Sequence, residues 1–409
     1  MMGKLTDLSK LALALVLVAG CTKDGPLTPP PGIPDQTNGR ITIINDDARL
    51  AERMVVTNLD VPIDPGPLGK AGSVQAFSLK QIAEIPSPVV NGQTLQATSV
   101  VLDNKIAYVS YNMAGSDYVG AIDVIQLRSF GNPALRSEAT FTDTDVSSVC
   151  FSGSFVYLAT ATANPLFDSP SVVEAIGIKG NKLDLTTNFR RILSSYVATS
   201  VAVNNGKVYV TTGNTGGLYT LSSDTLGIGS FVSLNDARWV DADGTNLVVV
   251  QGTTGRIAVF DQSSGTLRNT FPFDGANIAE SKSSVRLIGG KALIAAGDGG
   301  VQLMNLANGK VVGSLPRLIV PGLDPGKSVT NAVDGAAQHI FISNGEAGVY
   351  VAQSSVALEG QTGSANINLT MLGQLRFANL QSVNHVAFDG ENLVIAAGLG
   401  GVKIVTVSY

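Results

Sequence analysis

The sequence predicts an all-β fold: a closed seven-bladed β-propeller of four-stranded antiparallel blades, with an eight-bladed ring as the alternative. Two observations lead to this prediction. One pattern of short apolar strands and turns recurs seven times between residues 97 and 409. The recurrences lie about 48 residues apart, and a repeat of roughly 40–50 residues with several strands per unit is typical of propeller blades.

The repeat is clearest in two distant segments that carry nearly the same phrase. Residues 291–306 read KALIAAGDGGVQLMNL, and residues 392–409 read NLVIAAGLGGVKIVTVSY. Each phrase is a strand, a glycine-containing turn and a second strand, and an apolar inner strand precedes it. Turns such as NNGK and FDGE tolerate the positive φ that tight hairpins require. The first valine of each unit marks a common register: Val100, Val149, Val201, Val240, Val285, Val333 and Val386.

The last unit stops after its third strand, at Tyr409, so we expect its outer strand to come from elsewhere in the chain. Residues 72–86, GSVQAFSLKQIAEIP, have strand character and precede the first full unit. We expect them to close the ring by pairing with the last blade, because open sheet edges are a liability. Residues 41–60 could add another strand or a partial eighth blade. A β-helix or a stacked sandwich is the other architecture for such strands.

The N-terminus predicts export to a bacterial cell envelope. Lys4 and Lys10 precede an apolar run over residues 11–19. This run is shorter than the roughly 20 residues that cross a bilayer, and it has the size of a signal-peptide core. It ends in LVAGC, which resembles the lipobox of bacterial lipoproteins. The resemblance implies a signal peptide over residues 1–20 and lipid on the thiol of Cys21. A buried N-terminal helix with an incidental cysteine is the alternative.

Residues 21–40 are rich in proline and polar side chains, and they predict an extended, lipidated tether. Residues 41–409 then form a single propeller domain. Thr22, not aspartate, follows Cys21, and by resemblance to the sorting rule of enteric bacteria this favours anchoring in the outer membrane. Whether the domain faces the periplasm or the exterior stays open. Cys150 lies in an apolar run and is expected to be a buried free thiol.

The phrases NLVIAAGLGGVKIVTVS and ALIAAGDGGVQLMNL resemble the LVIVD repeats of bacterial surface and envelope propellers. The resemblance covers most of residues 97–409 and is strongest in the last three units. It implies a fold and no particular activity. The family often has an aspartate in the third strand where this chain has Thr406. Propellers of the WD type are a poorer match, because the chain has one tryptophan and no Trp-Asp pair.

Composition and motifs argue against several classes of function. The net charge is −5 and there is no basic run, so no nucleic-acid partner is predicted. Two histidines and two cysteines leave little material for a metal centre, and we expect neither a metal nor a cofactor. HExxH, GxSxG, CxxC and phosphate-loop motifs are absent, so no catalytic residue is predicted. Residues 241–246, DADGTN, faintly resemble a calcium loop, but an Asp-Gly hairpin turn is favoured.

Candidate binding residues are those that depart from the repeat near one mouth of the channel. In five units the two residues before the register valine are small or short and polar, whereas residues 238–239 and 384–385 break this pattern. The first two units also carry long loops after their second strands, and long loops on a rigid scaffold often bind partners. The candidates are Arg238, Trp239, Asn384, His385, Asn331, Tyr111, Asp117, Tyr118, Phe167 and Asp168. The alternative is that Trp239 fills a gap between blades and Arg238 is a solvated rim charge.

These observations favour a lipid-anchored binding module that holds an envelope protein or a glycan on its loop face. One alternative is a propeller enzyme of the lyase or hydrolase type with its site at the channel mouth. His339 and His385 cannot build a multi-histidine metal site, but a pair of His385 with a carboxylate would favour this alternative. A structural component of the cell surface is the third interpretation.

Overall fold

The computed structural model describes residues 33–34, 39–65, 77–127, 132–360, 363, 365–377 and 382–409. Residues 31–409 form one compact unit. The predicted signal peptide, Cys21 and most of the predicted tether lie outside the described residues, as do residues 72–76 of the predicted closing segment.

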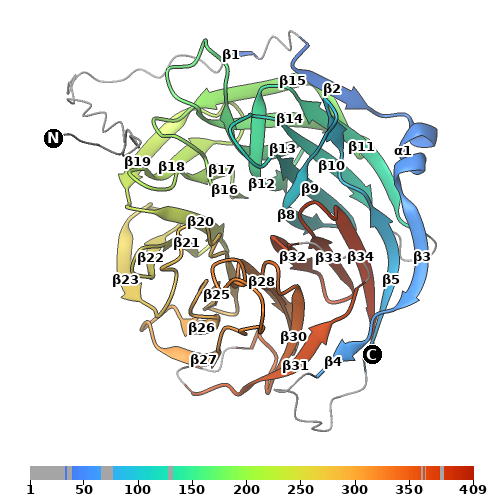
Figure 1. Cartoon of the computed structure of the whole chain (residues 1–409). Helices are drawn as coiled ribbons and strands as arrows, with labels where there is room; N and C mark the ends of the chain where they lie inside the picture. The colour runs from blue at the N-terminus through green and yellow to red at the C-terminus, as the bar shows by residue number, and fades with distance from the viewer. Residues whose placement is uncertain are drawn as a thin grey trace, which may run out of the picture. The chain divides into compact units, whose positions relative to one another are not determined.

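Seven antiparallel sheets stand around a central axis, which confirms the predicted seven-bladed propeller (Figure 1). In each of the first six blades the chain runs from the inner strand outward. Blade 1 consists of β8 (Gln96–Asp103), β9 (Ile106–Asn112), β10 (Gly120–Gln126) and β11 (Ala134–Phe141). Blade 2 consists of β12 (Thr144–Ser152), β13 (Phe155–Thr162), β14 (Ser171–Lys179) and β15 (Lys182–Ile192). Blade 3 consists of β16 (Ser200–Asn204), β17 (Lys207–Thr211), β18 (Gly217–Ser222) and β19 (Ile228–Ser233).

The next three blades repeat this arrangement with shorter strands. Blade 4 consists of β20 (Ala237–Ala242), β21 (Asn246–Gln251), β22 (Arg256–Asp261) and β23 (Leu267–Pro272). Blade 5 consists of β24 (Val285–Ile288), β25 (Lys291–Ala295), β26 (Val301–Asn305) and β27 (Val311–Leu315). Blade 6 consists of β28 (Ala332–Ala336), β29 (His339–Ser343), β30 (Val349–Ser354) and β31 (Leu369–Leu375). A short hairpin with two residues in each strand, β6 (Val89–Val90) and β7 (Gln93–Thr94), precedes blade 1.

Blade 7 joins the two ends of the propeller. It contains β32 (His385–Phe388), β33 (Asn392–Ala396) and β34 (Val402–Ser408), and its next strand outward is β5 (Ser78–Ile85). The pairing of β5 with β34 is antiparallel and runs from Val402 opposite Ile85 to Ser408 opposite Ser78. The strand from the N-terminal side therefore closes the ring and leaves β34 no free edge.

A belt, residues 33–34 and 39–64, runs around the outside of four blades (Figure 1). Its strands pair with one outer edge after another: β1 (Ile33–Pro34) with blade 2, β2 (Ile41–Ile44) with blade 1, β3 (Val55–Asp60) with blade 7 and β4 (Ile63–Asp64) with blade 6. Residues 41–60 therefore add strands to two existing blades, and the partial eighth blade is wrong. The outer strands of blades 3, 4 and 5 carry no fifth strand from the described residues.

Helix α1 (Asp47–Arg53) lies within the belt, between β2 and β3. The side chain of Asp46 caps its first turn by accepting hydrogen bonds from the backbone N–H groups of Ala48 and Arg49. Leu50 is buried among the apolar side chains of blades 1 and 7. None of the described helices has the length and apolar character that a membrane span needs.

Two arginines of the belt reach buried carboxylates of the blades. Arg53 pairs with Asp123 of β10 and with Glu138 of β11, and Arg40 pairs with Glu174 of β14. Asp123 and Glu174 are fully buried. A buried carboxylate is costly without a partner, so the belt supplies charges that blades 1 and 2 need.

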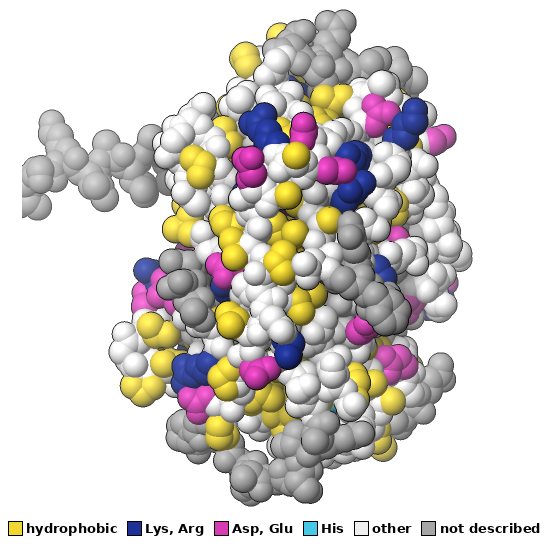
Figure 2. Space-filling model, turned by 90° about the vertical axis from the view of Figure 1, so that its right-hand side faces the viewer, with side chains coloured by type: hydrophobic (Ala, Val, Ile, Leu, Met, Phe, Trp, Pro, Cys, Tyr) yellow, Lys and Arg dark blue, Asp and Glu magenta, His cyan; other side chains and the backbone are white. Residues whose placement is uncertain are grey.

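The belt also gives the rim an apolar surface. Figure 2 looks onto this side, where hydrophobic side chains lie among charged ones. On β3, Val55, Val56 and Leu59 are 52%, 44% and 56% exposed. These side chains lie on the outermost strand of blade 7, away from the channel.

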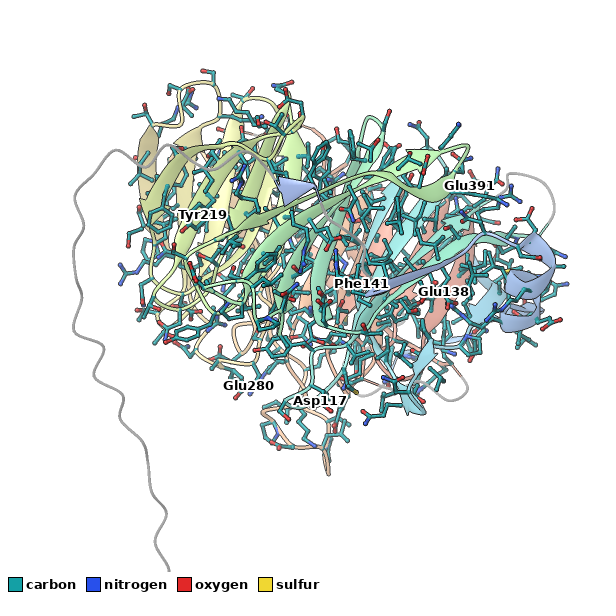
Figure 3. The ribbon with its side chains drawn as sticks, turned by 90° about the horizontal axis from the view of Figure 1, so that it is seen from above. Asp117, Glu138, Phe141, Tyr219, Glu280 and Glu391 are labelled. Atoms are coloured by element: carbon teal, nitrogen blue, oxygen red, sulfur yellow. The ribbon has the colours of Figure 1, made fainter. Side chains whose placement is uncertain are left out.

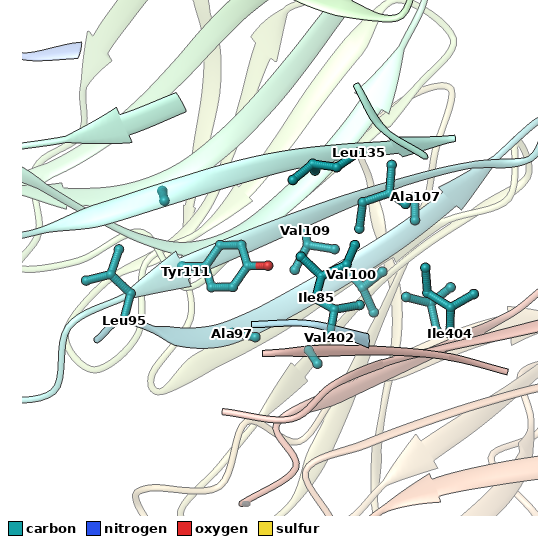
Figure 4. Packing of buried hydrophobic residues seen from close by; sticks show 14 of the residues in the cluster. Ile85, Leu95, Ala97, Val100, Ala107, Val109, Tyr111, Leu135, Val402 and Ile404 are labelled. Carbon is teal, nitrogen blue, oxygen red and sulfur yellow. The ribbon is translucent and has the colours of Figure 1, made fainter. Parts of the chain in front are cut away.

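Neighbouring blades pack through apolar side chains on the faces of their sheets. Figure 4 shows this packing between the first and last blades, where Val100 and Val109 of blade 1 lie near Ile85, Val402 and Ile404 of blade 7. Each such side chain contributes on the order of 1.5–3 kcal/mol when it is buried. The repeat therefore builds a rigid ring on which loops and channel residues are held in place.

Candidate functional site

Trp239 and His385 stack on each other across the central channel. Their ring centroids lie 5.0 Å apart with an interplanar angle of 21°. Each residue directly precedes its register valine, in blades 4 and 7. The other blades carry only serine or alanine at this position: Ser99, Ser148, Ser200, Ser284 and Ala332. Two large rings therefore meet where the remaining blades leave space.

The stacked pair separates two cavities. One, of about 220 Å³, is lined by the inner strands of all seven blades, including Trp239 and His385. The other, of about 500 Å³, opens on the face that carries the loops between second and third strands, and Trp239 also lines it. Trp239 is only 8% exposed. Its indole therefore forms a floor between the cavities and not an open platform.

His385 is a neutral, partly buried imidazole. Burial, and to a smaller extent the charge of Lys282, lowers its pKa to about 3. Its Nδ1 atom has no hydrogen-bond partner among the described residues. The described part of the chain also shows no hydrogen bond between His385 and a carboxylate. Among the described residues, His385 is therefore not paired with a carboxylate, which is the arrangement that would favour a propeller enzyme.

Arg238 is buried at the border of the 500 Å³ cavity, and its guanidinium is bonded to groups of the protein. It occupies a β-bulge in β20, which turns its side chain toward the segment before blade 5. Its Nη2 lies 2.7 Å from Oδ2 of Asp236, and its Nη1 donates to the carbonyl oxygens of Ile278 and Ser281 at 2.9 and 3.2 Å. Only 5% of the residue is exposed. Arg238 is therefore neither a free cation for a partner nor a solvated rim charge.

The cation at this mouth is Lys282, which the sequence analysis missed. Its Nζ crosses the mouth to lie 3.4 Å from the carbonyl oxygen of Ser147 in blade 2. Burial lowers the pKa of Lys282 to about 8. Within the described part of the chain Lys282 has no ion pair, and it lines the 500 Å³ cavity.

The sequence carries a signal for Lys282 one position before the two residues that were compared in each unit. Three residues before the register valine, the other units carry only alanine, valine or threonine. The full set is Ala97, Val146, Ala198, Ala237, Lys282, Thr330 and Val383. A charged side chain at this position departs from the repeat as clearly as Trp239 does.

Asn331 and Asn384 line another cavity on the same face, of about 810 Å³. Nδ2 of Asn384 donates to the carbonyl oxygen of Ala97 at 2.8 Å and so links blade 7 to blade 1. Oδ1 of Asn331 accepts a hydrogen bond from the backbone N–H of Lys282 at 3.3 Å. Glu280 borders both this cavity and the 500 Å³ cavity. The two hollows therefore flank the mouth on either side of residues 279–282.

The long loops of the first two blades do not line either loop-face cavity. Tyr111 belongs to strand β9, where it is fully buried and donates a hydrogen bond to Asp123 at 2.6 Å. Its predicted place in a binding loop is therefore wrong. Asp117 and Tyr118 follow β9 in a loop, and Figure 3 shows Asp117 near the same edge of the ring as Glu280.

Asp145 of β12 fixes the base of that first loop. Its Oδ1 accepts hydrogen bonds from the backbone N–H groups of Met113 and Val119 at 3.3 and 3.1 Å. Burial raises the pKa of Asp145 to about 6. The loop is thus tied to blade 2 and does not extend over the cavities.

The second long loop carries Phe167 and Asp168. The guanidinium carbon of Arg190 lies 4.4 Å from the centre of the Phe167 ring. Asp168 is exposed. Residues 279–282 and 323–329 wall the loop-face cavities, and the two long loops do not.

Carboxylates on the opposite side of the channel serve the scaffold. Oδ2 of Asp241 accepts a hydrogen bond from the backbone N–H of Leu287, and Oδ2 of Asp334 accepts one from Phe388, both at 2.8 Å. Each bond links an inner strand to the following blade. Nε of Arg286 lies 3.4 Å from Oδ1 of Asp334. The two carboxylates thus bond backbone N–H groups at the channel-side edges of the neighbouring inner strands.

The faint calcium-loop motif is a hairpin turn. Oδ1 of Asp243 accepts hydrogen bonds from the backbone N–H groups of Thr245 and Asn246 at 2.8 and 2.7 Å. Such local bonds are typical of Asp in turns. The described residues contain no group of three or more His, Cys, Asp or Glu side chains placed to hold a metal ion.

Cys150 is a free thiol that borders the 220 Å³ cavity. It is partly buried, whereas the sequence predicted full burial. Burial raises its pKa to about 12, so the thiolate that would react or bind metal is scarce at neutral pH.

The chain matches no family model, and no curated protein matches it. Among solved structures it is similar to the computationally designed Ika8 protein, with 13% identity and a TM-score of 0.48 over 82% of this chain and 94% of that chain. It is also similar to BamB from Moraxella catarrhalis, with 12% identity and a TM-score of 0.49 over 87% of this chain and 98% of that chain.

Proposed function

We propose that this protein is a lipid-anchored binding module of the bacterial cell envelope that holds a partner protein on its loop face. The observation that carries this proposal is the pair of cavities, of about 500 and 810 Å³, which flank the channel mouth and share Glu280. Concave sites with a few polar groups on a rigid scaffold are typical binding sites. Their walls come from segments between blades, which can vary without disturbing the repeat.

The proposed anchor is the lipid on Cys21, on the strength of the LVAGC sequence, and Thr22 in place of aspartate after the cysteine favours the outer membrane. The belt supports a tethered arrangement. The chain enters its described part at β1, on the outer edge of blade 2, and the belt then follows the rim. We propose the outer membrane as the site of this anchor.

A protein partner fits this face better than a glycan. Sugar rings bind on exposed aromatic faces, but Trp239 is 8% exposed and His385 stacks on its ring. The loop-face cavities instead offer short polar side chains and a few charges, among them Glu280, Lys282 and Lys327. Electrostatic and hydrogen-bonding groups of this kind suit a polypeptide surface.

Site-specific photocrosslinking in the native host tests the binding face. We expect a photoreactive residue at Glu280 to capture an envelope protein. The control position is Glu391, which is 53% exposed and lies away from Glu280, toward the other edge of the ring (Figure 3). Asp324, which lines the 810 Å³ cavity, is a second position for the photoreactive residue. Equal capture from Glu280 and Glu391, or no capture from either Glu280 or Asp324, would overturn the proposed face.

The anchor has its own test. Cys21→Ala should leave a full-length precursor that incorporates no labelled palmitate, whereas Cys150→Ala should label normally. Unchanged palmitate labelling of the Cys21→Ala protein would contradict the anchor, whatever the crosslinking shows.

A further inference from the structure

We propose that Lys282 binds a carboxylate of the partner protein in the 500 Å³ cavity. This inference rests on the proposed function and assigns the group that the loop face recognises. The carboxylate would come from the C-terminus of a peptide chain or from an acidic side chain.

The position of Lys282 is the first argument. Its ammonium group has no ion pair within the described residues, and the one hydrogen bond that it donates there goes to the Ser147 carbonyl at 3.4 Å. A hydrogen bond of that length leaves donor capacity for a closer acceptor. An ammonium held over a cavity and partly shielded from water attracts an anion more strongly than an exposed one does.

The surrounding groups hold Lys282 where a ligand would meet it. Arg238 bonds the carbonyls of Ile278 and Ser281 on the same segment. Asn331 accepts the backbone N–H of Lys282 itself at 3.3 Å. Arg238 and Asn331 are therefore positioning residues, and Lys282 is the one that reaches the ligand.

The charges of the cavity favour a monoanion. The charged residues of its lining are Asp236 and Arg238, which pair with each other, together with Glu280 and Lys282. One cation therefore stands without a close partner, and the carboxylate of Glu280 lies on the same wall. A carboxylate matches a single ammonium, whereas Glu280 would repel a phosphate dianion more strongly than a carboxylate.

The chain offers a built-in reporter for this site. Trp239 is the single tryptophan of the sequence, and it lines the same cavity as Lys282. Its fluorescence in the full-length protein can follow titrations with small probes. The carboxylate probes are N-acetyl-diglycine, for a chain end, and N-acetylglutamate α-amide, for a side chain. The neutral and dianionic comparisons are N-acetyl-diglycine amide and inorganic phosphate.

We expect saturable changes with at least one carboxylate probe and none with the neutral amide. Lys282→Met, which keeps the apolar stem, should weaken binding at least about tenfold, since it removes a charge-assisted hydrogen bond. Lys327→Met is the matched control, because Lys327 is a 62% exposed cation on the same face that already pairs with Glu346. The tighter carboxylate probe identifies a chain end or a side chain as the source.

Equal binding of the amide, equal binding of phosphate, or unchanged affinity in a folded Lys282→Met variant would each overturn the carboxylate site. Thermal unfolding of Lys282→Met checks that it is folded, and Lys282→Gln is the second variant if it is not. Probe binding without photocrosslinking at Glu280 would leave the carboxylate site standing and remove the protein partner. Photocrosslinking at Glu280 without probe binding would leave the protein partner standing and remove the carboxylate site.

Discussion

The guanidinium of Arg53 in the belt pairs with the buried carboxylate of Asp123 in blade 1, 70 residues along the chain. The same carboxylate accepts the hydroxyl of Tyr111 at 2.6 Å. A helix outside the ring thus completes a polar cluster inside it. Belt and blade are therefore a single folding unit at this point.

Arg53→Met should lower the free energy of unfolding by about 3–5 kcal/mol, because it leaves Asp123 buried without its cation. Arg49→Met, at an exposed position of the same helix, should stay within about 0.5 kcal/mol of the unmodified protein. Urea denaturation followed by far-UV circular dichroism measures both. Equal stability of the two variants would show that the pair contributes nothing.

His385 should make the protein sensitive to acid. Its folded pKa is lowered to about 3, so the unfolded chain takes up the proton first as the pH falls. The contribution of a neutral His385 is complete above the ordinary pKa near 6.5 and is lost between there and about pH 3, with a slope up to about 1.4 kcal/mol per pH unit.

His385→Phe should therefore lose less stability than the unmodified protein when the pH drops from 7 to 5. The comparison is made by urea denaturation at each pH. Burial also lowers the pKa of His339. His339→Phe should therefore remove a separate part of the acid sensitivity. Parallel stability curves for His385→Phe and the unmodified protein would contradict the buried neutral state.

Gly252 should be needed for the position of Arg238. A Cβ atom at Gly252 would lie 2.0 Å from Cζ of Arg238. Gly252→Ala should displace the guanidinium from Asp236 and cost about as much stability as Arg238→Met, roughly 3 kcal/mol. The double variant should cost little more than either single one, because both remove the same contacts.

Gly229→Ala is the control, because Gly229 lies on the outer strand β19 and the nearest atom to an added Cβ, the carbonyl oxygen of Thr220, would be 3.4 Å away. Fully additive losses in the Gly252→Ala, Arg238→Met double variant would show that the two changes act separately.

A disulfide across the closing strands should stabilise the ring. Lys80 of β5 and Thr406 of β34 are directly opposite in the antiparallel pairing. Lys80→Cys with Thr406→Cys should raise the free energy of unfolding by about 2–4 kcal/mol when oxidised, because the bond constrains the unfolded chain. Reduction should remove the gain, and Lys80→Cys alone should show none. A bond that forms without changing the melting temperature would indicate that the ring does not open there during unfolding.

The blades were predictable because each is encoded within about 48 residues of chain, where alternating apolar residues and glycine turns act locally. The closing strand was predictable because the last unit lacks an outer strand. The belt was not, since β2 pairs with residues about 95 positions away and no repeat marks its place.

The site was predicted in part. Trp239 and His385 stood out because they break a ring of small residues, and the structure brings them into contact. Arg238 was misplaced because a β-bulge turns it toward Asp236 and Ile278, and a bulge has no sequence signature here. Tyr111 was misplaced because the strand extends further than the turn signal indicated.

A pull from the N-terminal side of the described chain would meet the attachments of the belt one after another. The first is β1, with two paired residues, followed by Arg40 on Glu174 and the four pairs of β2. Arg53 and α1 come next, followed by the four pairs of β3 with β5 and the two pairs of β4 with β31, and the seven pairs between β5 and β34 come last. Under tension the belt would therefore detach from the blades in successive steps. Slack would be released from the rim while the ring stayed shut.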